Sequence, residues 1–267
     1  MVKKHLLLAG IAISVAGTGF AAASDSFNEQ QTKQIQQITK EYLLNNPQIL
    51  VEVSQKLQEQ QEQQLRKLEE NARRVIPQYA KDLFNNQNSP VVGNASGDVS
   101  VVEFFDYQCG HCKEMTEVMN TLEQKDSNLR IIYKEFPIFG QSSVYASKAA
   151  LAANKQGKYK EMHEALMETN NPLTVEKVMA AAKQVGLNAA LLQKDMNSDE
   201  IKNELNDNMR LAQKLGIMGT PAFIIGSTSK ASNKDSKSFF LPGSTSPEVL
   251  QGLIIEVRNG GDSKKKS

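Results

Sequence analysis

The chain has 267 residues, of which 40% are hydrophobic, and its formal net charge is +1. This length and composition are typical of a soluble globular protein with one large domain or two smaller ones. A charge this close to zero gives no electrostatic reason to expect nucleic acid or another polyanion as a partner.

The first 23 residues have the pattern of a secretory signal peptide. Lys3 and Lys4 form a basic start, residues 6–15 are an apolar run too short to span a bilayer, and Ala21 and Ala23 fit a signal-peptidase site. We therefore predict cleavage after Ala23 and a periplasmic protein; an uncleaved anchor is the alternative. Cleavage would leave a net charge of −1, in a compartment where disulfides persist.

Residues 28–84 have the periodicity of helices and almost no strand pattern. Apolar positions recur at helical spacing in two stretches separated by Asn46-Pro47, and a Gln- and Glu-rich segment interrupts the second stretch. A helix this polar has little apolar surface to bury within its own domain. Because the apolar positions are spaced like an interrupted coiled-coil seam, we predict that residues 24–88 form a helical oligomerisation region, as a homodimer. A trimer and a helix that drapes over the next domain are the alternatives.

The two cysteines of the chain lie at a predicted junction between a strand and a helix. The turn-rich residues 85–98 contain the domain boundary, so the second domain is expected to cover residues 89–260. Within it, residues 101–105 are an apolar strand pattern, and helical periodicity begins at Met115. The motif Cys109-Gly110-His111-Cys112 lies between the strand and the helix.

This position gives the motif a redox chemistry. The first turn of a helix presents free N–H groups and the positive end of the helix dipole, so the pKa of the Cys109 thiol should fall. Cys112, one turn later, would lie beneath it and close a small disulfide. His111 adds a donor and, when protonated, a charge, while Gly110 leaves room for a partner chain. The motif therefore predicts a reversible dithiol–disulfide couple.

Two other uses of the cysteines are less consistent with the sequence. A structural disulfide across two intervening residues would gain little loop entropy. Zinc usually needs four ligands, and the mature chain offers at most Cys109, Cys112, His111 and His163. A site shared by two copies of the motif across a dimer remains the metal alternative. We interpret His163, which lies among apolar residues of a predicted helix, as a packed or surface histidine, and we expect no cofactor or metal.

A proline near the end of the chain is a second candidate for the site. Thr220-Pro221 immediately precedes an apolar strand pattern; a cis bond there would expose the backbone of Thr220, which could then pair with a bound peptide as an added strand. An ordinary trans proline at a strand start is the alternative. The other expected elements are a strand at 129–136, a helical insertion at about 141–200, a helix ended by Gly216, a return strand at 239–243, a helix at 247–258 and a basic tail at 261–267.

These motifs, taken in order, resemble the DsbA-type periplasmic thiol oxidoreductases of the thioredoxin fold. The resemblance covers roughly residues 91–259. It implies an α/β thioredoxin fold with an inserted helical subdomain, preceded by an all-helical region. It also implies a cis bond at Pro221, and a role for Glu103 as a buried acid that assists proton transfer to Cys112. The segments that carry it are Glu103-Phe104-Phe105-Asp106-Tyr107, the Cys109–Cys112 motif, Phe136-Pro137, Gly157-Lys158-Tyr159 and Gly219-Thr220-Pro221-Ala222-Phe223.

The N-terminal region is similar to the extensions of dimerising or trimerising relatives, which include disulfide isomerases such as DsbC and DsbG. Gly-His between the cysteines resembles protein disulfide isomerase. The resemblance implies an enzyme that forms or isomerises disulfides in exported proteins, with a membrane redox partner resembling DsbB or DsbD. The alternative is a secreted oligomeric chaperone or metal-handling protein that uses the fold for binding; association with the outer membrane or cell surface is a third possibility.

Overall fold

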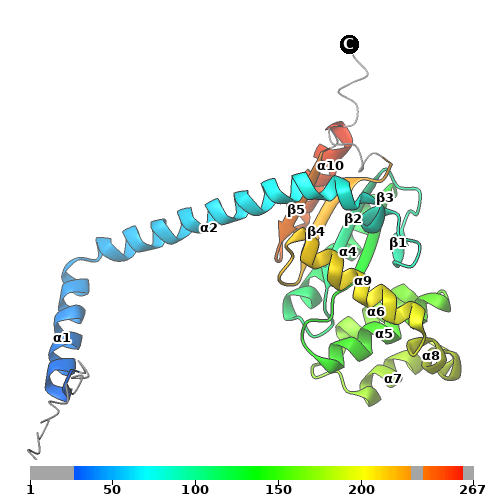
Figure 1. The fold of residues 1–267 in the computed structure, drawn as a ribbon, viewed down its shortest axis with the longest axis horizontal. Helices are drawn as coiled ribbons and strands as arrows, with labels where there is room; N and C mark the ends of the chain where they lie inside the picture. Colours follow the sequence, from blue (N-terminus) through cyan, green and yellow to red (C-terminus); the bar gives the residue numbers. More distant parts are fainter. Residues whose placement is uncertain (1–26, 230–236, 261–267) are drawn as a thin grey trace, which may run out of the picture. The chain divides into compact units, whose positions relative to one another are not determined.

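The computed structural model describes residues 27–229 and 237–260 (Figure 1). The predicted signal peptide and basic tail lie outside these residues. Contacts within the chain divide it into two compact units, residues 1–59 and 60–267, and we describe each by itself. Among the described residues, no helix combines the length and the hydrophobicity needed to cross a membrane.

Two helices, α1 (Glu29–Asn45) and α2 (Gln48–Val75), occupy the N-terminal region, and the break between them falls at the predicted Asn46-Pro47. Helix α1 begins with a capping box. Asn28 Oδ1 accepts a hydrogen bond from the backbone N–H of Gln31 at 2.8 Å, and the Gln31 side chain accepts one from the backbone N–H of Asn28 at 3.0 Å. The cap satisfies two N–H groups that a helix start otherwise leaves unpaired.

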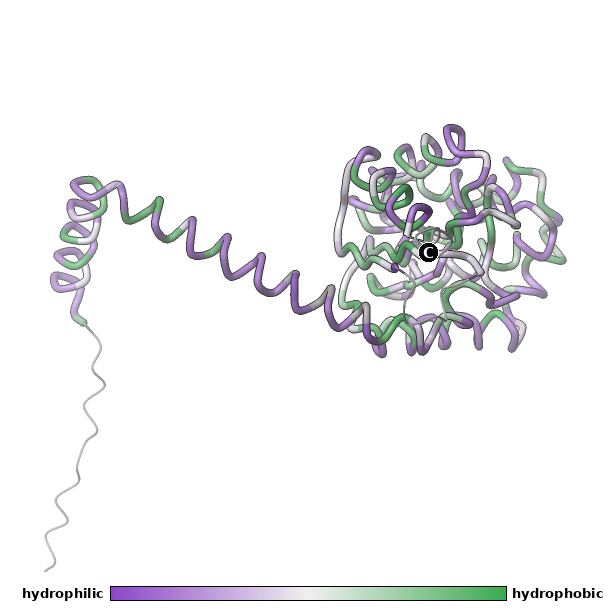
Figure 2. The backbone as a smooth tube through the Cα atoms, turned by 90° about the horizontal axis from the view of Figure 1, so that it is seen from above, coloured by the Kyte–Doolittle hydropathy of each residue, from purple (hydrophilic) through white to green (hydrophobic). Residues whose placement is uncertain are grey.

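Helix α1 and the first half of α2 expose apolar side chains. No residue of α1 is buried, and hydrophobic positions lie among hydrophilic ones along α1 and at the start of α2, whereas the middle of α2 is hydrophilic (Figure 2). Hydrophobic side chains that are from 44% to 70% exposed include Ile35, Ile38, Tyr42, Leu44, Leu50, Val51, Val53 and Leu57. Apolar area of this extent is typical of a surface that binds a partner.

The second unit is built around a sheet whose order, over the described residues, is β1-β3-β2-β4-β5 (Figure 1). Strand β2 pairs parallel with β3, and the other pairs are antiparallel. Strand β2 leads into the predicted site, and every one of its residues is buried. The strands are β1 (Val91–Gly93), β2 (Val99–Phe105), β3 (Leu129–Glu135), β4 (Ala222–Ser227) and β5 (Ser238–Pro242).

Helices cover the sheet and form an insertion between β3 and β4. Helix α5 contacts α6, α7, α8 and α9, so its alanine-rich face is the centre of the insertion. The last of these helices ends at Gly216, which adopts a left-handed φ of 73° as expected for a glycine cap. The helices are α4 (Gly110–Lys125), α5 (Gln141–Lys155), α6 (Tyr159–Glu168), α7 (Val175–Gln184), α8 (Ala189–Met196), α9 (Asp199–Leu215) and α10 (Pro247–Gly260).

Two short helices that precede β1 pack in the core of the second unit. They are η1 (Ile76–Tyr79) and α3 (Ala80–Phe84), and the sequence prediction placed both in the oligomerisation region. Phe84 is 0% exposed, and a Cβ on Gly226 would lie only 2.9 Å from its ring. The part of the chain that packs against the sheet therefore begins about a dozen residues before residue 89, where the turn-rich segment predicted the start of the domain.

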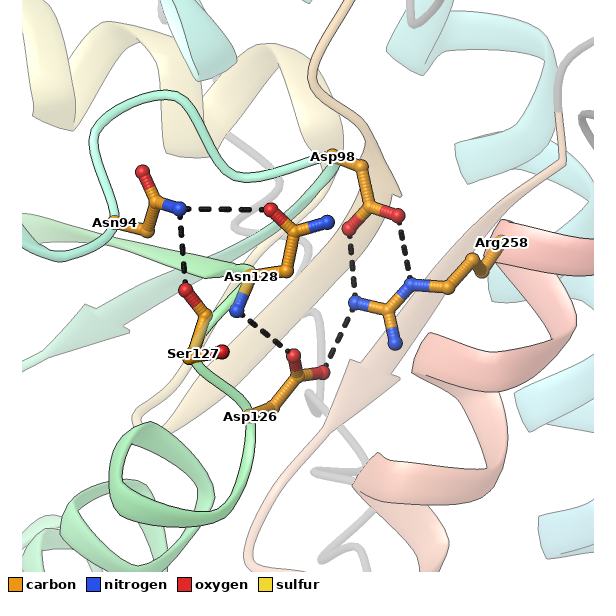
Figure 3. Close-up of polar contacts among 6 residues, drawn as sticks. All are labelled: Asn94, Asp98, Asp126, Ser127, Asn128 and Arg258. Atoms are coloured by element: carbon orange, nitrogen blue, oxygen red, sulfur yellow. Dashed lines mark hydrogen bonds and ion pairs between the residues drawn. The ribbon is translucent and has the colours of Figure 1, made fainter.

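An arginine in the last turn of α10 ties three segments together (Figure 3). The guanidinium of Arg258 donates to Asp98 at 2.7 and 2.8 Å and to Asp126 at 2.9 Å. These bonds join α10 to the loop before β2 and to the loop after α4. Asn94 links the same two loops by donating to the backbone carbonyl of Ser127 at 3.1 Å. The two carboxylates, Asp98 foremost, raise the pKa of Arg258 above its usual range.

We expect the Arg258→Ala substitution to lower the free energy of unfolding by about 1–2 kcal/mol, because it leaves two carboxylates without their bidentate partner. Arg258→Lys should recover little, since an ammonium cannot bind both carboxylates in this geometry. Arg210→Ala is the matched control, because its ion pair with Asp207 is more than 60% exposed on both sides. Urea unfolding measures all three; equal losses for Arg258→Ala and Arg210→Ala would contradict this role.

Candidate active site

Cys109 lies where β2 gives way to α4. It is the N-cap residue of α4, with extended backbone angles, and its N–H donates to the carbonyl of Asp106 at 3.0 Å. Cys109 is 5% exposed, and Cys112, in the first turn of the helix, is fully buried. Both are free thiols, so the structure represents the reduced form of the pair.

The surroundings of Cys109 favour its thiolate. The pKa of Cys109 is lowered from 9.0 to about 5, chiefly by a hydrogen bond with the Cys112 thiol. Thr220 and the backbone N–H groups of Cys112 and His111 lower it further, while burial acts in the opposite direction. At neutral pH, Cys109 is therefore a thiolate, which is the nucleophilic form of cysteine.

Cys112 behaves in the opposite way. Burial raises the pKa of its thiol far above the usual range, and hydrogen bonding to Cys109 and the charge of Glu103 add to the rise. Cys112 therefore keeps its proton and is available as a donor to the Cys109 thiolate. The two sulfurs have different roles: one is an acidic nucleophile and the other is a buried thiol that holds a proton.

Glu103 lies on β2 and is only 2% exposed. Burial, followed by the charge of Cys109, raises the pKa of this carboxyl from 4.5 to about 8. Because it interacts with both sulfurs electrostatically, Glu103 is placed to hold or release a proton at pH values near neutrality. Glu103 is thus buried, as the resemblance implied, and its role in proton transfer to Cys112 stays a prediction.

The loop before β4 meets Cys109. The peptide bond between Thr220 and Pro221 is cis, as expected. The thiol of Cys109 donates to the carbonyl oxygen of Thr220 at 3.3 Å. The hydroxyl of Thr220 is buried and has no hydrogen-bond partner among the described residues while Cys109 is a thiol, so it can donate to the thiolate.

The residues between the cysteines are exposed. The Nδ1 atom of His111 lies 3.1 Å from Glu114 Oε2, and Glu114 raises the pKa of the imidazole. The backbone N–H of His111 lowers the pKa of Cys109, and the charge of Cys109 in turn raises the pKa of the imidazole, so both the backbone and the side chain of His111 interact with Cys109. A Cβ on Gly110 would meet no atom within 4 Å. The idea that Gly110 leaves room for a partner chain stays a prediction.

Asp106 is a site residue that the sequence did not reveal. Its Oδ1 atom accepts hydrogen bonds from the N–H of Gln108 at 2.8 Å and from Ser143 Oγ at 2.7 Å, and its Oδ2 atom accepts one from the N–H of Phe139 at 2.9 Å. The carboxylate therefore anchors the turn before Cys109 to the start of α5. Phe139 and Ser143 are more than 30 residues away along the chain, so no local pattern points to them.

A buried polar cluster lies next to this turn. Tyr107 and Tyr159 both donate to Glu135 Oε1, at 3.1 and 2.9 Å, and His163 Nδ1 lies 3.2 Å from the Tyr107 hydroxyl. Burial raises the pKa of Glu135 to about 8 and lowers that of His163 to about 3. His163 is a packed, neutral histidine, as interpreted from the sequence. Within the described ranges, no three His, Cys, Asp or Glu residues are grouped to hold a metal ion.

Two protein families match the chain. The DSBA-like thioredoxin domain family matches residues 100–254, and the N-terminal domain family of the copper resistance protein ScsC matches residues 31–64. The first match contains the cysteines and the loop before β4. The second falls on the exposed helices of the N-terminal region.

Solved structures share the fold. A thioredoxin-like oxidoreductase from Silicibacter pomeroyi is 39% identical, covers 67% of this chain and 97% of its own, and superposes with a TM-score of 0.61. ScsC from Proteus mirabilis, in a transitional conformation, is 27% identical, covers 86% of this chain and 98% of its own, and has a TM-score of 0.60. The latter match extends into the N-terminal helices.

Among curated relatives, the thiol:disulfide interchange protein DsbA of Burkholderia cepacia is 24% identical over 69% of this chain and 88% of its own length. The chain also matches the Na⁺/H⁺ antiporter NhaA 1 of Salinispora arenicola, with 25% identity over 51% of this chain. It spans about a fifth (21%) of the length of that antiporter.

Proposed function

Because the chain belongs to the DsbA-like thioredoxin domain family, we propose that it is a thiol:disulfide oxidoreductase that forms disulfide bonds in exported proteins, isomerises them, or does both. The observation that carries this proposal is the opposite tuning of two adjacent thiols. The pKa of Cys109 is lowered to about 5 while that of Cys112 is raised. A thiolate this stable stabilises the reduced form of the protein, which makes the disulfide form a strong oxidant.

In the oxidising direction, a substrate thiolate attacks the sulfur of Cys109 in the Cys109–Cys112 disulfide. The S–S bond breaks, its electron pair goes to the sulfur of Cys112, and that sulfur takes up a proton, for which the Glu103 carboxyl is a nearby source. The second substrate thiolate then attacks the mixed disulfide, and Cys109 leaves as a stable thiolate. The substrate loses two electrons and the enzyme gains them.

In the isomerising direction, the reduced enzyme starts the reaction. The Cys109 thiolate attacks a wrong disulfide in the substrate, which forms a mixed disulfide and releases the other substrate sulfur as a thiolate. A different substrate thiolate then attacks the mixed disulfide, the correct disulfide forms, and Cys109 leaves as a thiolate, with no net change in oxidation state. If the mixed disulfide stalls, Cys112 loses its proton, attacks Cys109 and releases the substrate in reduced form. Oxidation needs a membrane partner resembling DsbB to restore the disulfide, and isomerisation needs a reductant resembling DsbD.

The same proposal includes a substrate contact and a compartment. The Thr220 carbonyl lies beside Cys109, which supports strand-like pairing of a bound polypeptide with the loop before β4. A periplasmic location follows from the targeting pattern of residues 1–23 and from the need for an oxidising environment. Cell fractionation tests the location, and it also separates a free periplasmic protein from one attached to the outer membrane.

We also propose self-association through residues 24–88, as a homodimer. The support is the row of exposed apolar side chains on α1 and α2, for which a second copy offers a matching surface. Paired catalytic units around one substrate favour isomerisation, because a misfolded chain held between them is attacked more than once before it escapes.

The test introduces two charges into this surface, as Ile38→Lys with Leu50→Lys. We expect light scattering to show a monomer, since lysines at the seam are costly to bury. The variant should still oxidise reduced ribonuclease at the wild-type rate but should recover scrambled ribonuclease severalfold more slowly. Ser54→Lys with Gln58→Lys, at exposed polar positions of α2, is the charge-matched control. A wild-type monomer would contradict self-association, and a wild-type protein inactive in both assays would contradict the enzyme.

A further inference from the structure

Gln108, the residue before the nucleophile, has its backbone held on both sides. Its N–H donates to Asp106 Oδ1 at 2.8 Å, and its carbonyl oxygen accepts a hydrogen bond from Asn171 Nδ2 at 2.8 Å. The N–H of Cys109 belongs to the same peptide unit as that carbonyl, and it donates to the Asp106 backbone carbonyl at 3.0 Å. Because a peptide unit is planar, these two bonds fix the plane that leads into Cys109.

The side chain of Gln108 is held as well. Its Nε2 atom donates to the Phe139 carbonyl at 3.2 Å and to Ser143 Oγ at 3.1 Å, and its Oε1 atom lies 3.4 Å from the N–H of Leu173, which donates to it. All polar groups of Gln108 are therefore engaged.

The partners of Gln108 come from separate parts of the second unit. Phe139 lies in the loop before α5 and Ser143 in its first turn, while Asn171 and Leu173 lie in the loop between α6 and α7. That loop belongs to the helical insertion between β3 and β4 (Figure 1). The insertion therefore reaches the active site through Gln108, although it supplies neither cysteine.

The location of this contact matters for the chemistry. The donors that stabilise the Cys109 thiolate are the Cys112 thiol, Thr220 and the N–H groups of Cys112 and His111. Hydrogen bonds to sulfur weaken when the donor is misdirected, so the benefit depends on where the Cys109 sulfur lies. A rotation of the peptide plane before Cys109 moves that sulfur relative to all of these donors together.

We propose that Gln108 and Asn171 are positioning residues that fix the peptide plane before Cys109 and so aim its sulfur at the donors that stabilise the thiolate. The proposal rests on the function proposed above, and it makes the helical insertion a determinant of the redox balance. Neither side chain is charged, so the effect arises from geometry. The titratable groups that face Cys109 are Cys112 and Glu103, with His111 alongside on α4, and the proposed substitutions leave all three in place.

The test compares Asn171→Ala and Gln108→Met with Asn170→Ala in the reduced mature protein. Asn170 is the matched control, because its side chain is exposed and makes no hydrogen bond to another described residue. Thiolate absorbance at 240 nm is titrated between pH 3 and 10. We expect the titration midpoint of Cys109 to rise by at least about half a pH unit, or threefold in proton affinity, in the variants at Asn171 and Gln108. It should stay unchanged in Asn170→Ala.

A second readout is the equilibrium of the Cys109–Cys112 disulfide with glutathione. For the variants at Asn171 and Gln108, we expect this equilibrium constant to shift at least threefold towards the disulfide form, which makes them weaker oxidants. Their unfolding midpoints show that the protein remains folded. Unchanged titration and unchanged equilibrium in two folded variants would overturn the positioning role. If Asn171→Ala unfolds, Gln108→Met decides the question, because it keeps the side-chain length and adds no charge near Cys109 while it removes both polar groups of the carboxamide. A wild-type protein without exchange activity would overturn the proposed function instead, since the titration does not depend on a substrate.

Discussion

Replacement of Cys109 by serine removes disulfide exchange, with an expected loss of about a thousandfold or more in insulin reduction. A serine hydroxyl does not ionise near neutral pH, so the variant lacks the nucleophile that the Cys112 thiol, Thr220 and the backbone donors stabilise. The loss should be the same for oxidation of reduced ribonuclease and for recovery of scrambled ribonuclease. Both reactions pass through a mixed disulfide at this sulfur.

The matched variant is Cys112→Ser, which keeps the nucleophile and removes the group that releases a stalled complex. We expect it to accumulate mixed disulfides with substrate, visible as added mass that dithiothreitol removes. Full insulin reduction by Cys109→Ser would contradict the enzymatic reading. Equal suppression of aggregation by the wild type and both variants, without exchange in any of them, would favour the chaperone alternative.

Phe84→Ala should lower the free energy of unfolding of the second unit by about 3–5 kcal/mol, the usual cost of removing a buried phenylalanine. The ring is 0% exposed, packs over Gly226 of β4 and belongs to one cluster with Val102 of β2. Truncation leaves a cavity that the sheet cannot fill by moving. Urea unfolding followed by circular dichroism measures the loss.

Phe139→Ala is the control for this prediction, because its side chain is 53% exposed in the same unit. We expect it to cost less than about 1 kcal/mol. Similar losses for both substitutions would mean that residues 76–84 do not belong to the core of the catalytic unit. The N-terminal limit of that unit would then lie nearer to residue 89, as the turn-rich sequence first suggested.

Local patterns predicted the features of this site that depend on neighbouring residues. The apolar strand, the helical period from Met115 and the cysteines between them fix a strand-to-helix junction, and β2 and α4 have the expected places. Gly216 ends α9 because a left-handed residue is needed there. The resemblance to a family added the cis bond at Pro221, which periodicity alone could not distinguish from a trans bond.

Contacts between distant segments could not be predicted in this way. The hydrogen bond from Asn171 to Gln108 joins residues 63 positions apart. The packing of Phe84 could not be predicted, because the sequence of a short helix that follows a long polar helix looks like a continuation of the same helical region. The burial of a charged residue could not be predicted either. Lys134 is 0% exposed and its Nζ atom donates to Ser89 Oγ at 2.6 Å, yet its sequence context is that of an ordinary strand.

The central claim is that Cys109 is an unusually acidic thiol, and a titration of the reduced mature protein tests it most directly. Thiolate absorbance at 240 nm, followed in the wild type and in Cys112→Ser, assigns the transition to Cys109. We expect a wild-type midpoint near pH 5, with the buried Cys112 thiol still protonated at pH 9. Because this pKa is lower in the folded than in the unfolded protein, ionisation of Cys109 stabilises the reduced form increasingly as the pH rises from about 5 to 9, whereas the raised pKa values of Glu103 and Glu135 act in the opposite direction. A midpoint near 9, the ordinary value for a thiol, would contradict the account.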